Sequence, residues 1–161
     1  MFTLRFVSTL LIILFAVIRT VALEDTFLAS ILNIESRCIE KHRIPISATK
    51  SIPEHVISYK IKWTIELIFT ITPRDSSFWD NVPFMVAGKL PNGKLTRQNV
   101  SAKQLRVRGN NIEFVVDMEV DKSGWADFIL TNRNASMENS LYDFPIHSNK
   151  YSVNLICDGL R

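Results

Sequence analysis

The chain has 161 residues, of which 47% are hydrophobic and 22% are charged, and its formal net charge is +3. This length leaves room for one folded domain once an N-terminal targeting segment is set apart. Because phosphate binding requires a clustered excess of positive charge, a nucleic-acid-binding surface is not expected.

The first 22 residues have the layout of a secretory signal peptide. Arg5 lies in a short basic start, and an apolar run follows from Phe6 to Ile18. Thr20 and Ala22 occupy the small-residue positions that a signal peptidase prefers. We therefore predict a signal peptide over residues 1–22, with cleavage after Ala22.

Cleavage leaves residues 23–161 as a single domain that is secreted into an extracellular, oxidising compartment. The alternative is a retained membrane anchor, but the apolar run is shorter than the roughly 20 residues that span a bilayer. Loss of Arg5 and Arg19 leaves 17 basic residues against 16 acidic ones, a net charge of +1. No later segment is long and apolar enough to span a membrane, so no span is expected after cleavage.

The clearest periodic stretch runs from Tyr59 to Ile71, with the sequence YKIKWTIELIFTI. Its odd positions carry large apolar side chains, and its even positions are charged or hydroxylic except for Ile68. Successive side chains of a strand point to opposite faces, whereas a helix would spread the same apolar groups around its circumference. The stretch therefore predicts a long strand with one face in the core and one in water.

Further strands are expected at intervals of roughly 8 to 12 residues, separated by turn-forming residues. Asn92–Gly93 favours two residues with positive φ and predicts a tight hairpin between Leu90 and Leu95. The expected strands are 59–71, 84–90, 103–108, 112–120, 125–131, 142–146 and 151–157. A set of about six to eight short strands is typical of an all-β, antiparallel β-sandwich.

The segment from Asp25 to Cys38 has a different, helical periodicity. Its apolar residues recur at spacings of three and four: Phe27, Leu28, Ile31, Leu32 and Ile34. Asp25 and Thr26 are acceptable caps. We expect a short N-terminal helix or an irregular arm here, followed by a loop or short edge strand between Pro45 and Pro53.

The two cysteines, Cys38 and Cys157, are predicted to form an intramolecular disulfide bond in an oxidising compartment. The outward and inward alternation of residues 151–157 places Cys157 on the core side. The alternatives are free or intermolecularly paired thiols. Metal binding is less favoured, because the chain lacks a C-x-x-C spacing.

Two N-x-[ST] sequons, at Asn99 and Asn134, predict glycosylation in solvent-facing loops. Each motif alone is a weak signal, and the signal peptide strengthens both.

The loop over residues 75–81 combines two aromatic side chains with polar neighbours. Phe78 and Trp79 offer apolar contact, and Asp80 and Asn81 can orient a ligand through hydrogen bonds. These four residues are the candidate binding site. The alternative is that both rings fold back and close the end of the sandwich.

The residues that carry common enzyme or metal chemistry are dispersed. His42, His55 and His147 lie in no known ligand motif, and nucleophile-elbow, Walker and dinucleotide-binding motifs are lacking. Glu113, Asp117 and Glu119 would share one exposed strand face, which suits solvent better than a calcium ion. We therefore expect no cofactor, no metal and no enzymatic activity.

Together these features favour a secreted, glycosylated interaction module that binds an extracellular protein partner. The alternative is a carrier of a small ligand, either a lipid between the two sheets or a carbohydrate at the 75–81 loop.

Overall fold

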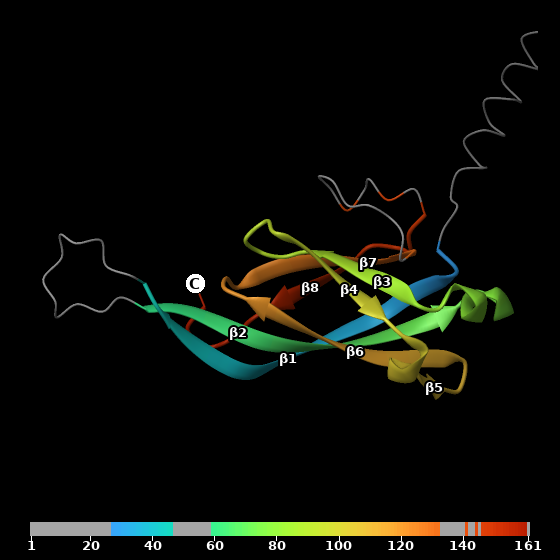
Figure 1. The fold of residues 1–161 in the computed structure, drawn as a ribbon, viewed down its shortest axis with the longest axis horizontal. Coiled ribbons are helices and arrows are strands. Elements are labelled where there is room, and N and C mark those ends of the chain that lie inside the picture. Colours follow the sequence, from blue (N-terminus) through green and yellow to red (C-terminus); the bar gives the residue numbers. More distant parts are fainter. Residues whose placement is uncertain (1–26, 47–58, 133–140, 142–143, 145, 161) are drawn as a thin grey trace, which may run out of the picture.

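The computed structural model describes residues 27–46, 59–132, 141, 144 and 146–160. They form eight strands in two four-stranded antiparallel sheets, which confirms the predicted β-sandwich (Figure 1). Sheet B has the strand order β1-β2-β6-β5, and sheet A has the order β4-β3-β7-β8. The strands are β1 Ala29–Pro45, β2 Tyr59–Pro73, β3 Phe84–Lys89, β4 Leu95–Val100, β5 Arg106–Arg108, β6 Asn111–Val120, β7 Gly124–Asn132 and β8 Tyr151–Leu155. Two short 3-10 helices interrupt them, η1 Ser76–Asn81 and η2 Ala102–Gln104.

β2 is the long strand predicted from its alternating sequence. Leu67, Phe69 and Ile71 are buried, while the intervening side chains lie on the outer face of sheet B. β6 pairs with β2 and shows the same alternation, with Phe114 opposite Phe69. A one-sided pattern in both neighbours fixes which face of sheet B is the core face.

The N-terminal segment is neither a helix nor an irregular arm, so that prediction was wrong. Residues Ala29–Pro45 form β1, an edge strand antiparallel to β2. Its register shifts at two bulges, whose extra residues are Leu32 and Ile39. A bulge adds one residue to a strand, so the buried Ile31 and Ile34 lie three positions apart instead of two. This spacing produced the apparent helical period.

Interlocking aromatic rings fill the interior between the sheets. The Phe69 ring stacks on Phe114 with centroids 4.9 Å apart and meets Phe128 edge-on at 5.8 Å. Phe84 meets Phe114 edge-on at 5.4 Å and lies 5.7 Å from Phe78. Each such pair contributes about 0.5–1.5 kcal/mol beyond the burial of apolar area. The space along this chain of rings is occupied by the protein's own side chains.

One lateral edge of the sandwich is closed by contacts between β1 and β8. The Asn149 side chain accepts a hydrogen bond from the Ile31 N–H at 2.8 Å and donates one to the Ile31 carbonyl at 3.0 Å. The Tyr151 hydroxyl donates to the side-chain oxygen of Asn33 at 2.9 Å. Asn149 thereby takes the place of a strand partner at this edge.

The predicted disulfide bond between Cys38 and Cys157 is present, with the two Cα atoms 6.0 Å apart. It joins β1 to the segment after β8 and so links sheet B to sheet A. The Trp63 indole N–H donates to the carbonyl of Asp158 at 3.1 Å, which holds the C-terminal segment against β2.

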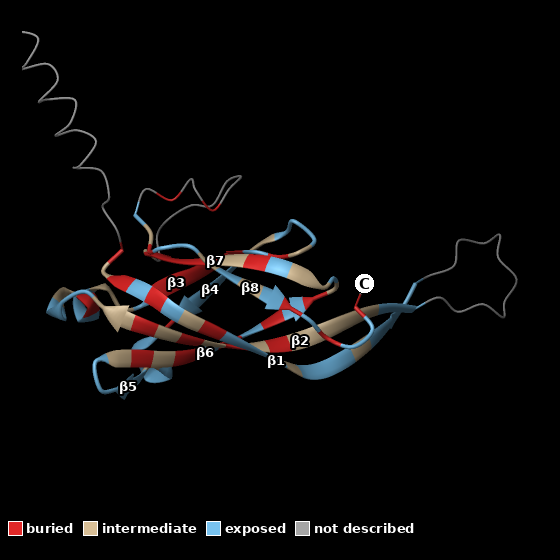
Figure 2. Cartoon of the chain, turned by 180° about the vertical axis from the view of Figure 1, so that it is seen from behind, coloured by how far each residue is buried: buried red, intermediate tan, exposed pale blue. Residues whose placement is uncertain are grey.

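Sheet A carries a second apolar cluster on its outer face. Met85 and Ala87 of β3 and Ile129 of β7 pack beneath Leu141 and Phe144. Buried positions consequently run along most of β3 and β7 (Figure 2). β7 is therefore apolar on both faces, unlike β2.

The predicted hairpin between Leu90 and Leu95 is present, but its backbone differs from the expected one. Gly93 has a positive φ of 83°, whereas Asn92 does not. The Gly93 N–H donates to the Leu90 carbonyl at 2.8 Å, and the Asn92 side chain accepts from the Lys94 N–H at 2.9 Å. The turn is thus closed over Leu90–Gly93, with glycine supplying the one left-handed residue.

Two further predictions need correction or lie partly outside the described residues. The expected strand 103–108 divides into η2 and the three-residue β5, because Lys103 and Gln104 belong to a 3-10 turn. Of the expected strand 142–146, residue Ile146 is a bend, and residues 142, 143 and 145 lie outside the described residues. The predicted signal peptide and most of the segment between Pro45 and Pro53 also lie outside them.

Within the described ranges, no helix is long and apolar enough to cross a membrane.

Candidate functional site

The predicted binding loop forms η1, which polar side chains hold in place. One Asp75 carboxylate oxygen accepts hydrogen bonds from the Ser77 hydroxyl and from its backbone N–H, the latter at 2.8 Å. These bonds lower the pKa of Asp75 below its ordinary value. The Asn81 amide donates to the Ser77 carbonyl at 3.0 Å. Asn81 therefore has a structural partner inside the turn.

The turn sends its two aromatic side chains to different environments. Phe78 is 0% exposed and packs against Phe84, whereas Trp79 is 46% exposed. The two rings meet edge-on with centroids 5.4 Å apart. Phe78 therefore belongs to the core. The alternative that both rings fold back onto the sandwich holds for Phe78 and not for Trp79. Trp79 and Asp80 remain at the surface.

A second exposed aromatic side chain, Trp125, lies on the outer face of sheet A. It is 66% exposed, and the residue opposite it in the ladder is Asn154. The next outward position after Asn154 is Ile156, which is 68% exposed. We call these three residues the Trp125 surface. The adjacent Asp127 carboxylate accepts hydrogen bonds from Ser152 at 2.5 Å and Lys150 at 3.3 Å, so polar groups border the surface.

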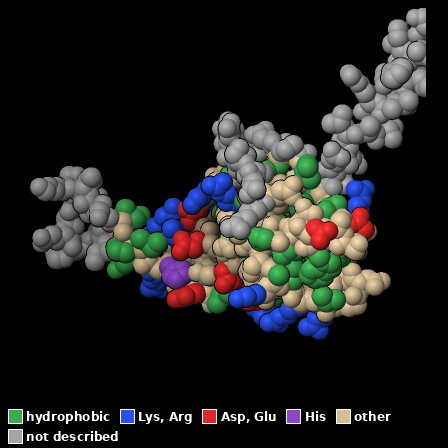
Figure 3. Space-filling model, turned by 45° about the vertical axis from the view of Figure 1, so that its right-hand side comes forward, with side chains coloured by type: hydrophobic (Ala, Val, Ile, Leu, Met, Phe, Trp, Pro, Cys, Tyr) green, Lys and Arg blue, Asp and Glu red, His purple; other side chains and the backbone are tan. Residues whose placement is uncertain are grey.

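Exposed apolar side chains also gather where β1 ends and β2 begins, with charged groups of both signs beside them (Figure 3). Tyr59, Ile44 and Ile46 are the exposed members of this group. The chain continues from here into residues 47–58, which lie outside the described residues. We therefore assign no function to this group of side chains.

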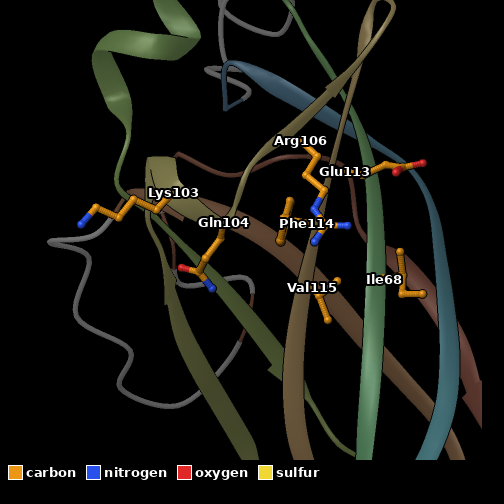
Figure 4. A pocket seen from close by; sticks show the side chains of 7 residues that line it. All are labelled: Ile68, Lys103, Gln104, Arg106, Glu113, Phe114 and Val115. Carbon is orange, nitrogen blue, oxygen red and sulfur yellow. The ribbon is translucent and has the colours of Figure 1, made fainter.

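An open pocket of about 370 Å³ lies where β5 leaves the side of β6 (Figure 4). Its lining residues come from β2, η2, β5 and β6: Ile68, Lys103, Gln104, Arg106, Glu113, Phe114 and Val115. In the close-up, Arg106 and Gln104 lie near Phe114, and the Glu113 carboxylate points away from this group. Arg108 donates to that carboxylate at 2.9 Å.

The described part of the chain brings no three potential metal ligands together. His42 bonds to the Thr64 hydroxyl at 2.8 Å, and His147 to the Ser148 carbonyl at 2.7 Å. Glu119 forms an ion pair with Lys62 at 3.3 Å, which fits a solvated strand face. His55 lies outside the described residues.

Asn99 of the first sequon is exposed, but it lies in β4 and not in a loop. It is opposite Met85 and therefore faces outward from sheet A. Trp125 lies near the other end of that sheet, because β7 pairs with β3 from Asn132 at one end to Asp127 at the other. Asn99 and Trp125 therefore lie toward opposite ends of the outer face of sheet A. Asn134 lies outside the described residues.

Sequence reasoning missed the Trp125 surface and the pocket for different reasons. The stretch from Trp125 to Thr131 was correctly expected to be a strand. However, both of its faces carry large apolar side chains, so alternation did not reveal which face was open. The pocket combines Gln104 with Val115, which are brought together only by the pairing of β5 with β6.

The fold and these surfaces define a disulfide-linked, all-β sandwich with exposed aromatic side chains. No protein-family model, curated protein or solved structure matches the chain.

Proposed function

We propose that this chain is a secreted, glycosylated interaction module that binds an extracellular protein partner through the Trp125 surface. The single observation that carries the proposal is the exposure of Trp125 on the regular backbone of β7. Tryptophan is a frequent anchor of protein interfaces, because it contributes large apolar area at a small cost in conformational entropy. The proposed role is binding and includes no catalytic step.

The surroundings of Trp125 suit such an anchor. Ile156 extends the apolar area, and Asn154, opposite Trp125, supplies a side-chain amide beside it. The hydrogen-bonded Asp127 lies beside them and forms part of a polar border. An apolar centre inside a polar rim is the usual arrangement of a protein interface.

The extracellular address rests on three features of the chain. The N-terminal segment has the layout of a signal peptide, and the Cys38–Cys157 bond is of the kind that persists in oxidising compartments. The Asn99 side chain is exposed and accessible to a glycan.

The alternative, a small-ligand carrier, has support only in its carbohydrate version. Aromatic rings fill the core between the sheets, so no observation favours a lipid there. Trp79 and Asp80, in contrast, place an exposed ring beside a carboxylate, which is a combination that sugars contact.

The test is a binding screen of the secreted protein against an array of recombinant extracellular domains, with a glycan array in parallel. Trp125→Thr should weaken binding to a recognised domain by roughly tenfold or more, as expected for a central aromatic anchor. Val107→Thr is the matched control, because Val107 is 63% exposed and lies in β5 of the other sheet.

Equal binding by the Trp125→Thr variant would refute the assignment of this surface. Binding only on the glycan array, with loss in Trp79→Ala, would support the carbohydrate alternative instead.

A further inference from the structure

β6 has a free edge after Glu113, the last of its residues that pairs with β5. β5 pairs only with residues 111–113 of β6, whereas β2 pairs with residues 112–120 on the other side. The chain before β5 turns away into η2. The side of β6 that follows Glu113 therefore has no neighbouring strand among the described residues.

The direction of the backbone groups along this edge follows from strand geometry. In an antiparallel strand the N–H and C=O of one residue point to the same side, and alternate residues point to opposite sides. The Asp117 carbonyl points away from β2, because it accepts a hydrogen bond from the Gln98 side chain of β4 at 2.9 Å. Val115 and Glu119 have the same direction. This edge is a template for one more strand.

The pocket beside Val115 presents hydrogen-bond donors. The Gln104 oxygen accepts from the Ser101 N–H at 2.9 Å and from its hydroxyl at 3.1 Å, so its NH₂ group is left to donate elsewhere. Arg106 and Lys103 have no ion-pair partner within the described part of the chain, and Glu113 is engaged by Arg108. Two cations and an amide donor favour a carboxylate.

The apolar part of the pocket lies next to these donors. Val115 is opposite Ile68 in the ladder, and Arg106 is opposite Glu113. All four side chains lie on the outer face of sheet B, as does any residue added opposite Val115. A glutamate there could lay its stem on Ile68 and Val115 and extend its carboxylate toward Arg106.

We propose that the free edge of β6 binds an extended segment of a partner protein, with a single glutamate opposite Val115, as an added antiparallel strand. The segment pairs with Val115, Asp117 and Glu119 and displaces the Gln98 side chain from the Asp117 carbonyl. Its glutamate opposite Val115 binds Arg106 and Gln104, with Lys103 at the rim. This site is separate from the Trp125 surface and does not depend on it.

A second copy of the chain is a poorer occupant of this edge. Antiparallel pairing of two β6 edges over residues 115–119 places Asp117 directly opposite its symmetry mate. Like charges directly opposite each other destabilise a sheet. This register also places Glu119 of the second copy opposite Val115, but that carboxylate is already paired with Lys62 of its own chain at 3.3 Å.

The test uses a short fluorescein-labelled peptide of alternating threonine and valine with a central glutamate, titrated into the full secreted protein. We expect saturable binding that Arg106→Gln weakens about tenfold or more, the range for a charge-assisted hydrogen bond. Arg97→Gln is the matched control, because Arg97 is exposed on β4 of the other sheet and its substitution removes the same charge. Trp125→Thr should leave peptide binding unchanged.

Strand addition has a second, independent signature. In NMR-detected amide exchange, the Val115, Asp117 and Glu119 amides should exchange fast in the free protein and slow when the peptide is bound. The Val116 and Met118 amides should be slow in both states. N-methylation of the central glutamate should abolish binding, whereas N-methylation of either neighbouring residue should not, because their N–H groups point away from β6.

Three results would overturn the proposal. One is equal binding of a peptide with glutamine at the centre. Another is Arg106-dependent binding of a sulfated oligosaccharide while the peptide leaves the three amides unprotected, which would make the pocket a glycan site. The third is protection of these amides in a dimer of the free protein, which would identify a second copy as the occupant.

Discussion

At the scale of single residues, Gly88 shows how closely neighbouring strands of sheet A pack on the core face. It lies in β3 directly across from Phe128 of β7 and Thr96 of β4. A Cβ atom at this position would overlap the Phe128 ring and lie 3.3 Å from the Thr96 methyl group. The Phe128 ring cannot move aside easily, because it is fully buried and packed edge-on against Phe69.

Gly88→Ala should therefore lower the free energy of unfolding by about 1–3 kcal/mol, the usual cost of overpacking a core. Urea denaturation of the purified protein would measure the loss. In a Phe128→Leu background the same substitution should cost less, because the smaller side chain leaves room for the new methyl group. An unchanged stability of Gly88→Ala would show that β3 and β7 are not packed this closely.

At the scale of elements, Asp121 ties β2 to two turns. It lies between β6 and β7, and its carboxylate accepts from the Lys60 ammonium of β2 at 2.5 Å. Its other oxygen accepts from the Asn92 amide in the β3–β4 turn at 2.7 Å. The bond from Lys60 lowers the pKa of Asp121 below its ordinary value of 3.8, against the opposing effect of partial burial.

A lowered pKa in the folded state means that ionised Asp121 stabilises the fold at neutral pH. This contribution is complete above the unfolded value of 3.8 and is lost as the pH falls through the lower folded value. Asp121→Asn should lower the free energy of unfolding by about 1 kcal/mol at neutral pH. The deficit should disappear as the pH falls below the folded pKa of Asp121.

Urea denaturation at a series of pH values would follow this change. Asp80→Asn is the control, because Asp80 is exposed and makes no hydrogen bond or ion pair with another described residue. A deficit for Asp121→Asn that stays constant down to strongly acidic pH would contradict the electrostatic origin.

At the scale of the whole molecule, the sandwich was predictable because sheet B has a strict inside and outside. β2 and β6 alternate cleanly, and their buried members, such as Leu67 and Val116, lie opposite one another as the patterns imply. β1 was not predictable, since the bulge at Leu32 changes the spacing of buried residues without leaving a turn-forming residue as a sign.

The candidate sites were less predictable than the fold for a related reason. The 75–81 loop drew attention through its composition, yet only the packed structure decides that Phe78 is core and Trp79 is surface. Trp125 is open because the residues that cover sheet A, Leu141 and Phe144, lie over Met85 and Ile129. The extent of that cover depends on the path of a loop, which side-chain alternation does not encode.

The disulfide bond joins the two sheets covalently through residues that are far apart in sequence. Cys38 and Cys157 are 119 positions apart in sequence, and for a loop of this length the chain-entropy model gives roughly 4–5 kcal/mol of stabilisation. The double variant Cys38→Ala/Cys157→Ala should therefore lose about that much free energy of unfolding in urea denaturation. The native sheets should persist, because Asn149 and the Trp63–Asp158 hydrogen bond still hold the same edge together. A loss below about 1 kcal/mol would mean that these contacts already restrict the unfolded chain or carry the edge without the covalent bond.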